Sequence, residues 1–338
     1  MVGPRLHHHV SGDRIVTPVG PIQRQEPPPR NSDAPLRRVD PPPAGSTLGA
    51  LARAARPRQW LKNLLVFMAP AAAGVLGEWH TALRVVAAFL LFCVVASGTY
   101  LVNDVVDAES DRHHPTKRTR PVASGALRPG IALGVGGVLI ATAIGGAFVV
   151  GPWAFAIVVA TYAGLSIAYT LRLKTEPVVE LAAVASCFVL RAVAGGVVAH
   201  VPLSKWFLVF TSFAALFIVT GKRCAEYTRL GQNRGVHRLV LDDYSESFLK
   251  STLTIAATVT VASYCLWAFE RSGLLAHSGG NVVWMELTVI PLVLSVLHIL
   301  RLLDAGHGGE PEQIALHDHV LQGYGVLWLA LMGVGLYA

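Results

Sequence analysis

Long apolar runs, each close to 20 residues, alternate with short polar stretches along most of the chain. A helix needs about 20 apolar residues to cross the hydrocarbon core of a bilayer, so each run predicts one membrane-spanning helix. The pattern predicts an all-α, polytopic membrane protein, a bundle of about nine transmembrane helices. The predicted spans are residues 61–77, 83–103, 129–150, 152–170, 178–199, 204–222, 250–269, 283–303 and 319–337.

The beginning of the chain departs from this pattern. Residues 1–46 are rich in Pro and Arg, with two runs of three prolines, and are too polar for the apolar core of a signal peptide. Such a composition buries too little apolar surface to offset the entropy of folding. We therefore expect a disordered cytoplasmic tail over 1–46, followed by one transmembrane catalytic domain over 47–338.

Composition agrees with a membrane protein, because 53% of the residues are hydrophobic and only 14% are charged. The net charge of +7 is concentrated in the N-terminal tail and in alternate loops, chiefly 104–128, 171–177 and 223–249. Basic residues accumulate on the cytoplasmic side of membrane proteins. We therefore expect a multi-pass protein of the cell membrane with a cytoplasmic N-terminus and no nucleic-acid partner.

An acidic segment follows directly on the apolar run 83–102, and it contains Asn103, Asp104, Asp107 and Asp111. If the helix continues, the three aspartates recur at spacings of three and four and share one face. Neighbouring carboxylates repel one another unless a cation lies among them, and oxygen ligands of this kind suit Mg²⁺ that carries a diphosphate. The competing interpretation is a solvated acidic helix end.

A basic segment begins immediately afterwards and contains Lys117, Arg118 and Arg120. Clustered cations can neutralise phosphate oxygens that a metal ion does not reach. The alternative is a solvated charged surface. Because these cations directly follow three carboxylates at a membrane surface, the sequence favours phosphate binding.

Further candidates lie near the predicted cytoplasmic ends of other spans. Lys62 lies inside the start of the first span, Tyr169 and Lys174 flank the end of the fourth, and Lys222 and Arg223 follow the sixth. Their cationic groups add to the possible phosphate ligands at the same membrane surface. The polar face of this bundle end is therefore the predicted active site.

Two ionisable residues, Glu180 and Arg191, fall within the predicted fifth span. Their eleven-residue separation is about three helical turns and brings them to a similar face. Ionisable groups inside a membrane span are costly, so both are candidates for substrate binding. A structural ion pair between helices is the alternative.

The acidic segment and several other motifs resemble the UbiA superfamily of intramembrane prenyltransferases. Within that superfamily they are most similar to the actinobacterial branch that acts on decaprenyl phosphate. The residues that carry the likeness are 56–63 (RPRQWLKN), 100–104 (YLVND, beginning at Tyr100), 114–118 (HPTKR), 190–196 (LRAVAGG), 202–207 (PLSKWF), 221–223 (GKR) and 266–271 (LWAFER).

The resemblance implies transfer of a 5-phosphoribosyl group from phosphoribosyl diphosphate to a polyprenyl phosphate, for synthesis of a cell-envelope arabinan precursor. It implies Mg²⁺ held by Asp107 and Asp111, with Asn103 and Asp104 assisting. The cations of the basic segment would hold the diphosphate, and Lys62 would position the acceptor. The ribose 5-phosphate would be bound by Lys174, Lys222 and Arg223.

One departure from the wider superfamily bears on the donor. Ordinary members carry a second D-x-x-x-D motif, whereas this chain has Lys222, Arg223 and Glu226 in that region. The basic replacement favours a phosphoribosyl donor. The open alternatives are a UbiA-type aromatic prenyltransferase that uses a polyprenyl diphosphate and a non-catalytic transporter of lipid phosphates. Glycines within the spans permit close helix packing within or between subunits, so a homo-oligomer stays open as well.

Overall fold

The computed structural model confirms the predicted all-α fold: every regular element in the described residues is a helix. Almost all of the predicted tail, residues 1–46, lies outside the described part. The structure describes Gly3 and residues 46–337, apart from 115, 231–238, 278–281, 306–313 and 315–316.

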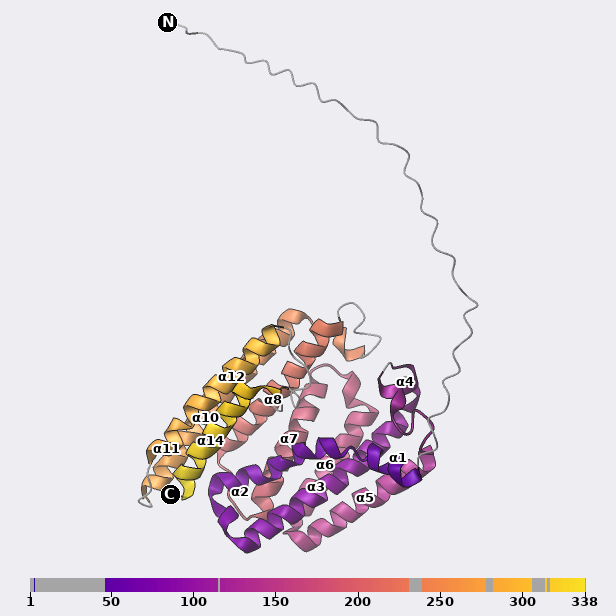
Figure 1. The fold of residues 1–338 in the computed structure, drawn as a ribbon, viewed down its shortest axis with the longest axis horizontal. Coiled ribbons are helices and arrows are strands. Elements are labelled where there is room, and N and C mark those ends of the chain that lie inside the picture. Colours follow the sequence, from indigo (N-terminus) through magenta and orange to yellow (C-terminus); the bar gives the residue numbers. More distant parts are fainter. Residues whose placement is uncertain are drawn as a thin grey trace. The chain divides into compact units, whose positions relative to one another are not determined.

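The elements follow one another with short connections (Figure 1). Several are short 3₁₀-helices, labelled η, and the rest are α-helices. In chain order they are α1 (Thr47–Ala54), η1 (Pro57–Phe67), α2 (Met68–Ala73), η2 (Val75–Gly77), α3 (Trp79–Val106), α4 (Ala108–His113), η3 (Lys117–Thr119), α5 (Pro129–Val150), α6 (Trp153–Leu171), η4 (Leu173–Thr175), α7 (Val179–Val198), α8 (Lys205–Leu230), η6 (Leu239–Leu241), α10 (Glu246–His277), α11 (Val282–Leu287), α12 (Val289–Asp304) and α14 (His319–Tyr337).

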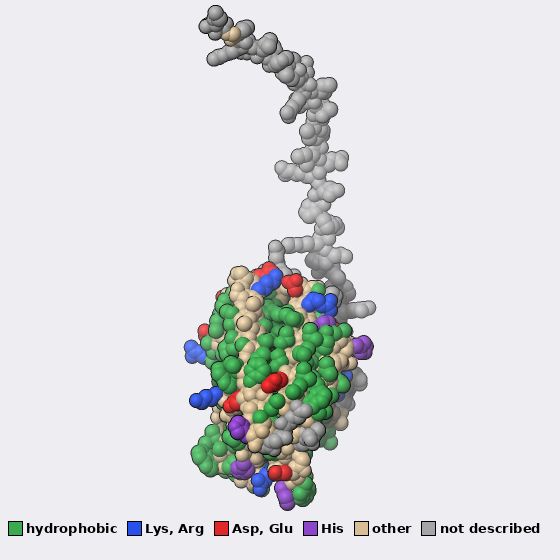
Figure 2. Space-filling model, turned by 90° about the vertical axis from the view of Figure 1, so that its left-hand side faces the viewer, with side chains coloured by type: hydrophobic (Ala, Val, Ile, Leu, Met, Phe, Trp, Pro, Cys, Tyr) green, Lys and Arg blue, Asp and Glu red, His purple; other side chains and the backbone are tan. Residues whose placement is uncertain are grey.

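Eight helical segments of the described chain are long and apolar enough to cross a membrane. They correspond to the second to ninth predicted spans, with α11 and α12 together forming one of them. Large apolar side chains such as Leu90 and Val149 are exposed on these helices, and Figure 2 shows a face covered mostly by hydrophobic side chains. Helices of this length and hydropathy are typical of bilayer spans, so the chain is a multi-pass membrane protein.

The first predicted span, residues 61–77, takes a different form. It consists of η1, α2 and η2 in place of one long helix. Pro70 lacks the N–H that a continuous helix needs, and Gly74 ends α2 in the left-handed conformation with φ of 76°. The segment nevertheless runs along the length of α3. Arg56, just before η1, contacts Asp104 near the end of α3, and η2 packs against α3 as well.

The core of the bundle is formed largely by small and aromatic side chains. Phe92 on α3 packs against Phe155 and Tyr162 on α6, and all three are buried. Gly195 on α7 permits the closest backbone approach, since a Cβ placed there would lie 1.8 Å from the carbonyl oxygen of Val66. This contact brings η1, with its polar residues, directly against α7.

Pairs of long helices give the bundle its shape. The pairs α3–α5 and α8–α10 have the most extensive contacts. Helices α6 and α7 connect the two pairs, because α6 packs against α5 and α7, and α7 packs against α8. In Figure 1 the helices α8, α10, α12 and α14 form one side, and α3 and α5 lie toward the other. The end of α3, the end of α6, the start of α7 and the end of α8 lie at the same end of the bundle, where the candidate site is found.

Candidate active site

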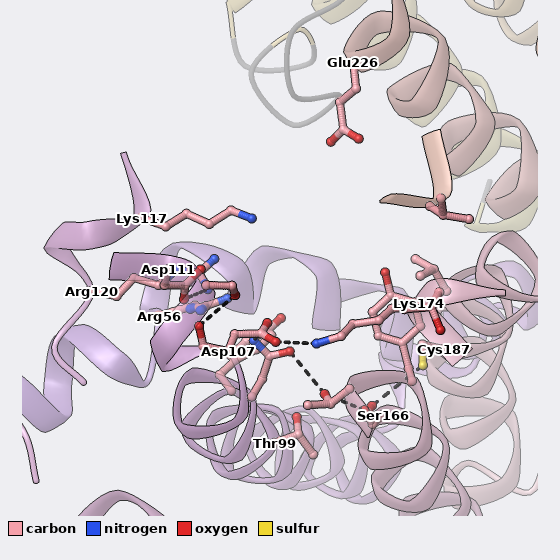
Figure 3. A pocket seen from close by; sticks show the side chains of 18 of the residues that line it. Arg56, Thr99, Asp107, Asp111, Lys117, Arg120, Ser166, Lys174, Cys187 and Glu226 are labelled. Carbon is pink, nitrogen blue, oxygen red and sulfur yellow. Dashed lines mark hydrogen bonds and ion pairs between the residues drawn. The ribbon is translucent and has the colours of Figure 1, made fainter. Parts of the chain in front are cut away.

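A cavity of about 900 Å³ opens at this end of the bundle, and Figure 3 shows part of its lining. Side chains from η1, α3, α4, α6, α7 and α8 and from the loops after α4 and α6 face it. The structure therefore brings together residues that lie more than 170 positions apart in the sequence. The predicted site residues that line it are Lys62, Tyr100, Asn103, Asp107, Asp111, Lys117, Arg120, Tyr169, Lys174 and Arg191.

The acidic segment is nearly one continuous helix, as predicted. α3 ends at Val106 and α4 begins at Ala108, while the N–H of Asp111 still donates to the carbonyl oxygen of Asp107 at 2.8 Å. At the small break Asp107 pairs with Lys174, whereas Asp104 and Asp111 both contact Arg120. Consequently they do not surround a single point.

Asp107 lies at the cavity wall in contact with Lys174, which extends from η4. The amide nitrogen of Asn103 donates to the other carboxylate oxygen of Asp107 at 3.0 Å. The hydroxyl of Thr170, at the end of α6, in turn donates to the side-chain oxygen (Oδ1) of Asn103 at 3.2 Å. These two hydrogen bonds orient the Asn103 side chain so that its amide N–H faces the Asp107 carboxylate. The Asp107 side chain keeps 21% of its surface exposed.

Asp111 and Arg120 form the second acidic–basic pair of the cavity, with 2.7 Å between Oδ2 and Nη1. Arg120 also approaches Asp104 at 3.6 Å, and Arg56 contacts the same carboxylate. Arg56 precedes η1 with a left-handed backbone (φ of 53°), and its guanidinium lies 5.0 Å from the ring centroid of Tyr100. One face of the cavity is therefore formed by Arg56, Arg120 and Asp111, with Asp104 packed behind them.

Asp104, which was expected to assist in holding Mg²⁺, differs from its neighbours in not lining the cavity. Only 1% of it is exposed, and it lies behind the cavity wall instead of lining it. In the structure it contacts both Arg56 and Arg120. Its Oδ2 atom is buried without a hydrogen-bond partner.

A deeper part of the cavity is lined by Arg191 on α7. This side chain is 3% exposed and donates to the Asn63 side chain at 2.8 Å and to the Tyr162 hydroxyl at 2.9 Å. Lys62 also lines this part, with its Nζ atom 5.9 Å from the ring centroid of Phe188. Two cations thus lie toward the membrane interior, separate in the fold from the Arg56–Arg120 group.

The structure gives Glu180 and Arg191 different partners, and Glu180 forms the ion pair between helices that was the alternative to substrate binding. Glu180 is completely buried and accepts two hydrogen bonds from Arg223 on α8, at 2.7 and 2.9 Å. Arg223 also donates to Glu226 at 2.8 Å. Neither Glu180 nor Arg223 lines the cavity, and the strong pairing occupies the guanidinium that was expected to bind phosphate.

Two other predicted phosphate ligands lie outside the cavity lining. Arg118 is exposed on η3, and Lys222 lies on α8 one residue before the buried Arg223. In their place α8 presents Glu226 and Arg229, and α6 presents Tyr162. Arg229 was missed because the sixth span was expected to end at 222, whereas α8 continues to Leu230.

The acidic residues at the cavity suit a metal ion only in combination with a ligand. In the described ranges, no three His, Cys, Asp or Glu side chains are grouped closely enough to hold an ion by themselves. Mg²⁺ commonly binds through one or two carboxylates together with substrate phosphates and water. Asp107 and Asp111, which offer hard oxygen atoms at the cavity wall, fit that mode.

Comparison with known proteins agrees with this architecture. The sequence matches the UbiA prenyltransferase family over residues 64–321. The chain belongs to this family. A UbiA-family fold is also found in a solved UbiA homolog from Archaeoglobus fulgidus bound to DMAPP and Mg²⁺, with a TM-score of 0.65 and 16% identity, over 85% of this chain and 97% of that one.

Two UbiA relatives are much more similar in sequence. The decaprenyl-phosphate phosphoribosyltransferase of Mycobacterium tuberculosis (strain ATCC 25618 / H37Rv) is 42% identical over 290 residues, which cover 85% of this chain and 94% of the relative. The protein of the same name from Corynebacterium glutamicum is 41% identical over 288 residues, covering 84% and 86% of the two chains. The likeness therefore covers most of the chain.

Proposed function

We propose that this UbiA-family protein transfers a 5-phosphoribosyl group from phosphoribosyl diphosphate to a polyprenyl phosphate such as decaprenyl phosphate, and releases diphosphate. The observation that carries the proposal is the identity of about two residues in five to decaprenyl-phosphate phosphoribosyltransferases over nearly their full length. The cavity supports it, because cations at several separate positions suit a reaction in which both substrates carry phosphate.

The donor diphosphate is assigned to the wall formed by α3, α4 and η3. Asp107 and Asp111 would hold Mg²⁺ together with diphosphate oxygens, with Asn103 orienting Asp107. Lys117 and Arg120 line the same wall and supply further positive charge. When bound, the metal ion stabilises the negative charge that the departing diphosphate acquires.

The acceptor phosphate is assigned to the deeper cations, Lys62 and Arg191. Arg191 is oriented by Asn63 and Tyr162 and lies on α7, which is long and apolar enough to span the membrane. Lys62 lies on η1, which exposes the apolar side chains of Leu61 and Leu64. A phosphate at this depth can be reached by a lipid whose tail lies between the helices and the bilayer. Arg191 therefore helps place the acceptor oxygen toward the donor.

The reaction places modest demands on acid–base chemistry. An oxygen of the anionic acceptor phosphate bonds to C1 of the ribose as the bond from C1 to the diphosphate oxygen breaks. The acceptor needs no strong base, since it is already deprotonated. Positioning and charge stabilisation by the cavity residues supply the main part of the catalysis.

The charge distribution of the loops supports a cytoplasmic location for the cavity. The acidic segment, the basic segment and the loop after α6 lie at one end of the bundle, and these regions carry most of the basic residues of the loops. Phosphoribosyl diphosphate would then enter from the cytoplasm. The lipid acceptor would enter from the cell membrane.

A radiolabel experiment tests the proposal. Membranes containing the protein are incubated with labelled phosphoribosyl diphosphate and decaprenyl phosphate, or with 4-hydroxybenzoate and a polyprenyl diphosphate. Metal-dependent incorporation of label into lipid with the first pair alone supports phosphoribosyl transfer. Product from the second pair alone identifies an aromatic prenyltransferase, and the absence of both products favours a transport role.

A further inference from the structure

Glu226 occupies a distinctive place in the cavity. It extends from α8 and lies across the open space from Asp107 and Lys117 (Figure 3). Asp107, Asp111 and Glu226 are the acidic side chains among the described cavity residues, and the first two belong to the wall assigned to the metal and diphosphate. Glu226 is therefore a carboxylate on a wall with a different chemical task.

The position of this carboxylate is fixed by residues behind it. Arg223 donates to Oε2 of Glu226 at 2.8 Å, and the same guanidinium binds Glu180 through two further hydrogen bonds. Arg223 is 3% exposed and Glu180 is 0% exposed, whereas the side chain of Glu226 keeps 18% of its surface accessible. A buried ion pair thus holds a partly exposed carboxylate at the cavity, which reduces the cost of ordering it when a ligand binds.

The chemistry of the proposed donor supplies a partner for such a group. The phosphates of phosphoribosyl diphosphate accept hydrogen bonds and attract cations, whereas the ribose 2- and 3-hydroxyls can donate hydrogen bonds to a carboxylate. A carboxylate near phosphate would repel it, so Glu226 is suited to the part of the donor that carries no charge. Arg229 lies one turn further along the same face of α8 and also lines the cavity, where it suits the ribose 5-phosphate.

We infer that Glu226 binds the ribose hydroxyls of the donor and makes the enzyme select a ribosyl over a deoxyribosyl group. The inference rests on the proposed function. It assigns the donor an orientation across the cavity, with its diphosphate at Asp107 and Asp111, its hydroxyls at Glu226 and its 5-phosphate near Arg229.

The test compares two donors, phosphoribosyl diphosphate and its 2-deoxy analogue, with decaprenyl phosphate as the acceptor. In the wild-type protein kcat/KM should be about 10–100-fold lower for the deoxy donor, the range expected for a hydrogen bond to a charged group. Glu226→Ala should lower kcat/KM for the ribosyl donor by a similar factor and affect the deoxy donor much less, because that donor keeps only the 3-hydroxyl as a partner. Glu226→Gln, which preserves the size of the side chain, should give a smaller loss of the same selectivity.

Glu109→Gln is the matched control, because Glu109 lies on α4 with its side chain 76% exposed and pairs with Arg112 at the surface. It should retain the wild-type ratio between donors. The half-saturating Mg²⁺ concentration is measured for every variant. A shift of that concentration in Glu226→Gln with no change in donor selectivity would identify a second metal ligand and overturn the inference.

Equal loss of activity toward both donors, or unchanged selectivity in both Glu226 variants, also overturns it. Either of these two contradicting results leaves the proposed function intact, as long as the wild-type protein transfers label from phosphoribosyl diphosphate. Absence of that transfer in the wild-type protein is the separate outcome that defeats the proposed function and this inference together.

Discussion

Two groups of ion pairs at the same end of the bundle differ in how completely they are buried. Glu180 and Arg223 join α7 to α8, with side-chain exposures of 0% and 4% and two hydrogen bonds between them. Asp107 and Lys174 join α3 to η4 at the cavity, with exposures of 21% and 28%. A carboxylate and a cation thus form a closed structural contact in one place and an accessible contact in the other.

The difference has a physical consequence for ligand binding. A buried charge that loses its partner has neither water nor another ion to replace it, so the pair is costly to open. At the cavity a phosphate or a metal ion can take the place of the original partner while water reaches both groups. Partly exposed pairs are therefore the ones that can exchange partners during a reaction.

The largest effect is expected for Asp107→Asn. The amide removes the negative charge assigned to the metal ion but keeps nearly the same shape, so kcat should fall by about 1,000-fold or more while the fold persists. Steady-state transfer of labelled phosphoribosyl groups, together with thermal unfolding in detergent, measures both effects. Near-normal turnover in this variant would remove Asp107 from the proposed metal site.

Glu180→Gln tests the buried pair. It leaves the Arg223 guanidinium without its bidentate ionic partner, and breaking such a pair costs on the order of 3 kcal/mol or more of unfolding free energy. Denaturant unfolding in detergent should show this loss, whereas Glu109→Gln, at an exposed pair, should change stability by less than about 1 kcal/mol. Equal stability of the two variants would contradict the assignment of Glu180 to the structural group.

Lys174→Gln tests the accessible pair at the cavity. Removal of this cation should raise KM for phosphoribosyl diphosphate and lower kcat/KM by about 10-fold, because a charge-assisted contact is lost near the donor. Stability should change little, since 28% of the Lys174 side chain is exposed. A large loss of stability with unchanged kinetics would place Lys174 with the structural pairs.

The smallest effect is expected at Asp318, which precedes α14 outside the spanning segments. The backbone N–H of Leu321 and then the side chain of His298 hold the pKa of Asp318 below its ordinary value. A lowered pKa stabilises the fold at pH values above the unfolded pKa of about 3.9, and this contribution disappears as the pH falls through the folded pKa. Asp318→Ala should therefore lower the melting temperature slightly at pH 7, and the difference from wild type should narrow toward pH 3; a constant difference would contradict this cause.

The membrane fold and the place of the acidic segment could be predicted from sequence because they depend on local patterns. Runs of apolar residues identify the spans wherever they occur. The helix period likewise places Asp104, Asp107 and Asp111, which are three and four residues apart, on a similar side of the helix. Where local pattern failed, as in residues 61–77, a proline and a left-handed glycine divide the span into shorter helices.

The sequence by itself therefore determined the class of protein, the order of its spans and the end of the bundle that carries the charged groups. Only the tertiary structure decided which of those groups face the cavity. Glu180 meets Arg223 across 43 positions and Arg191 meets Asn63 across 128, so their partners depend on how α7 packs against α8 and η1. Side-chain direction at such contacts is set by the rotation and approach of whole helices, and no local spacing of residues contains that information.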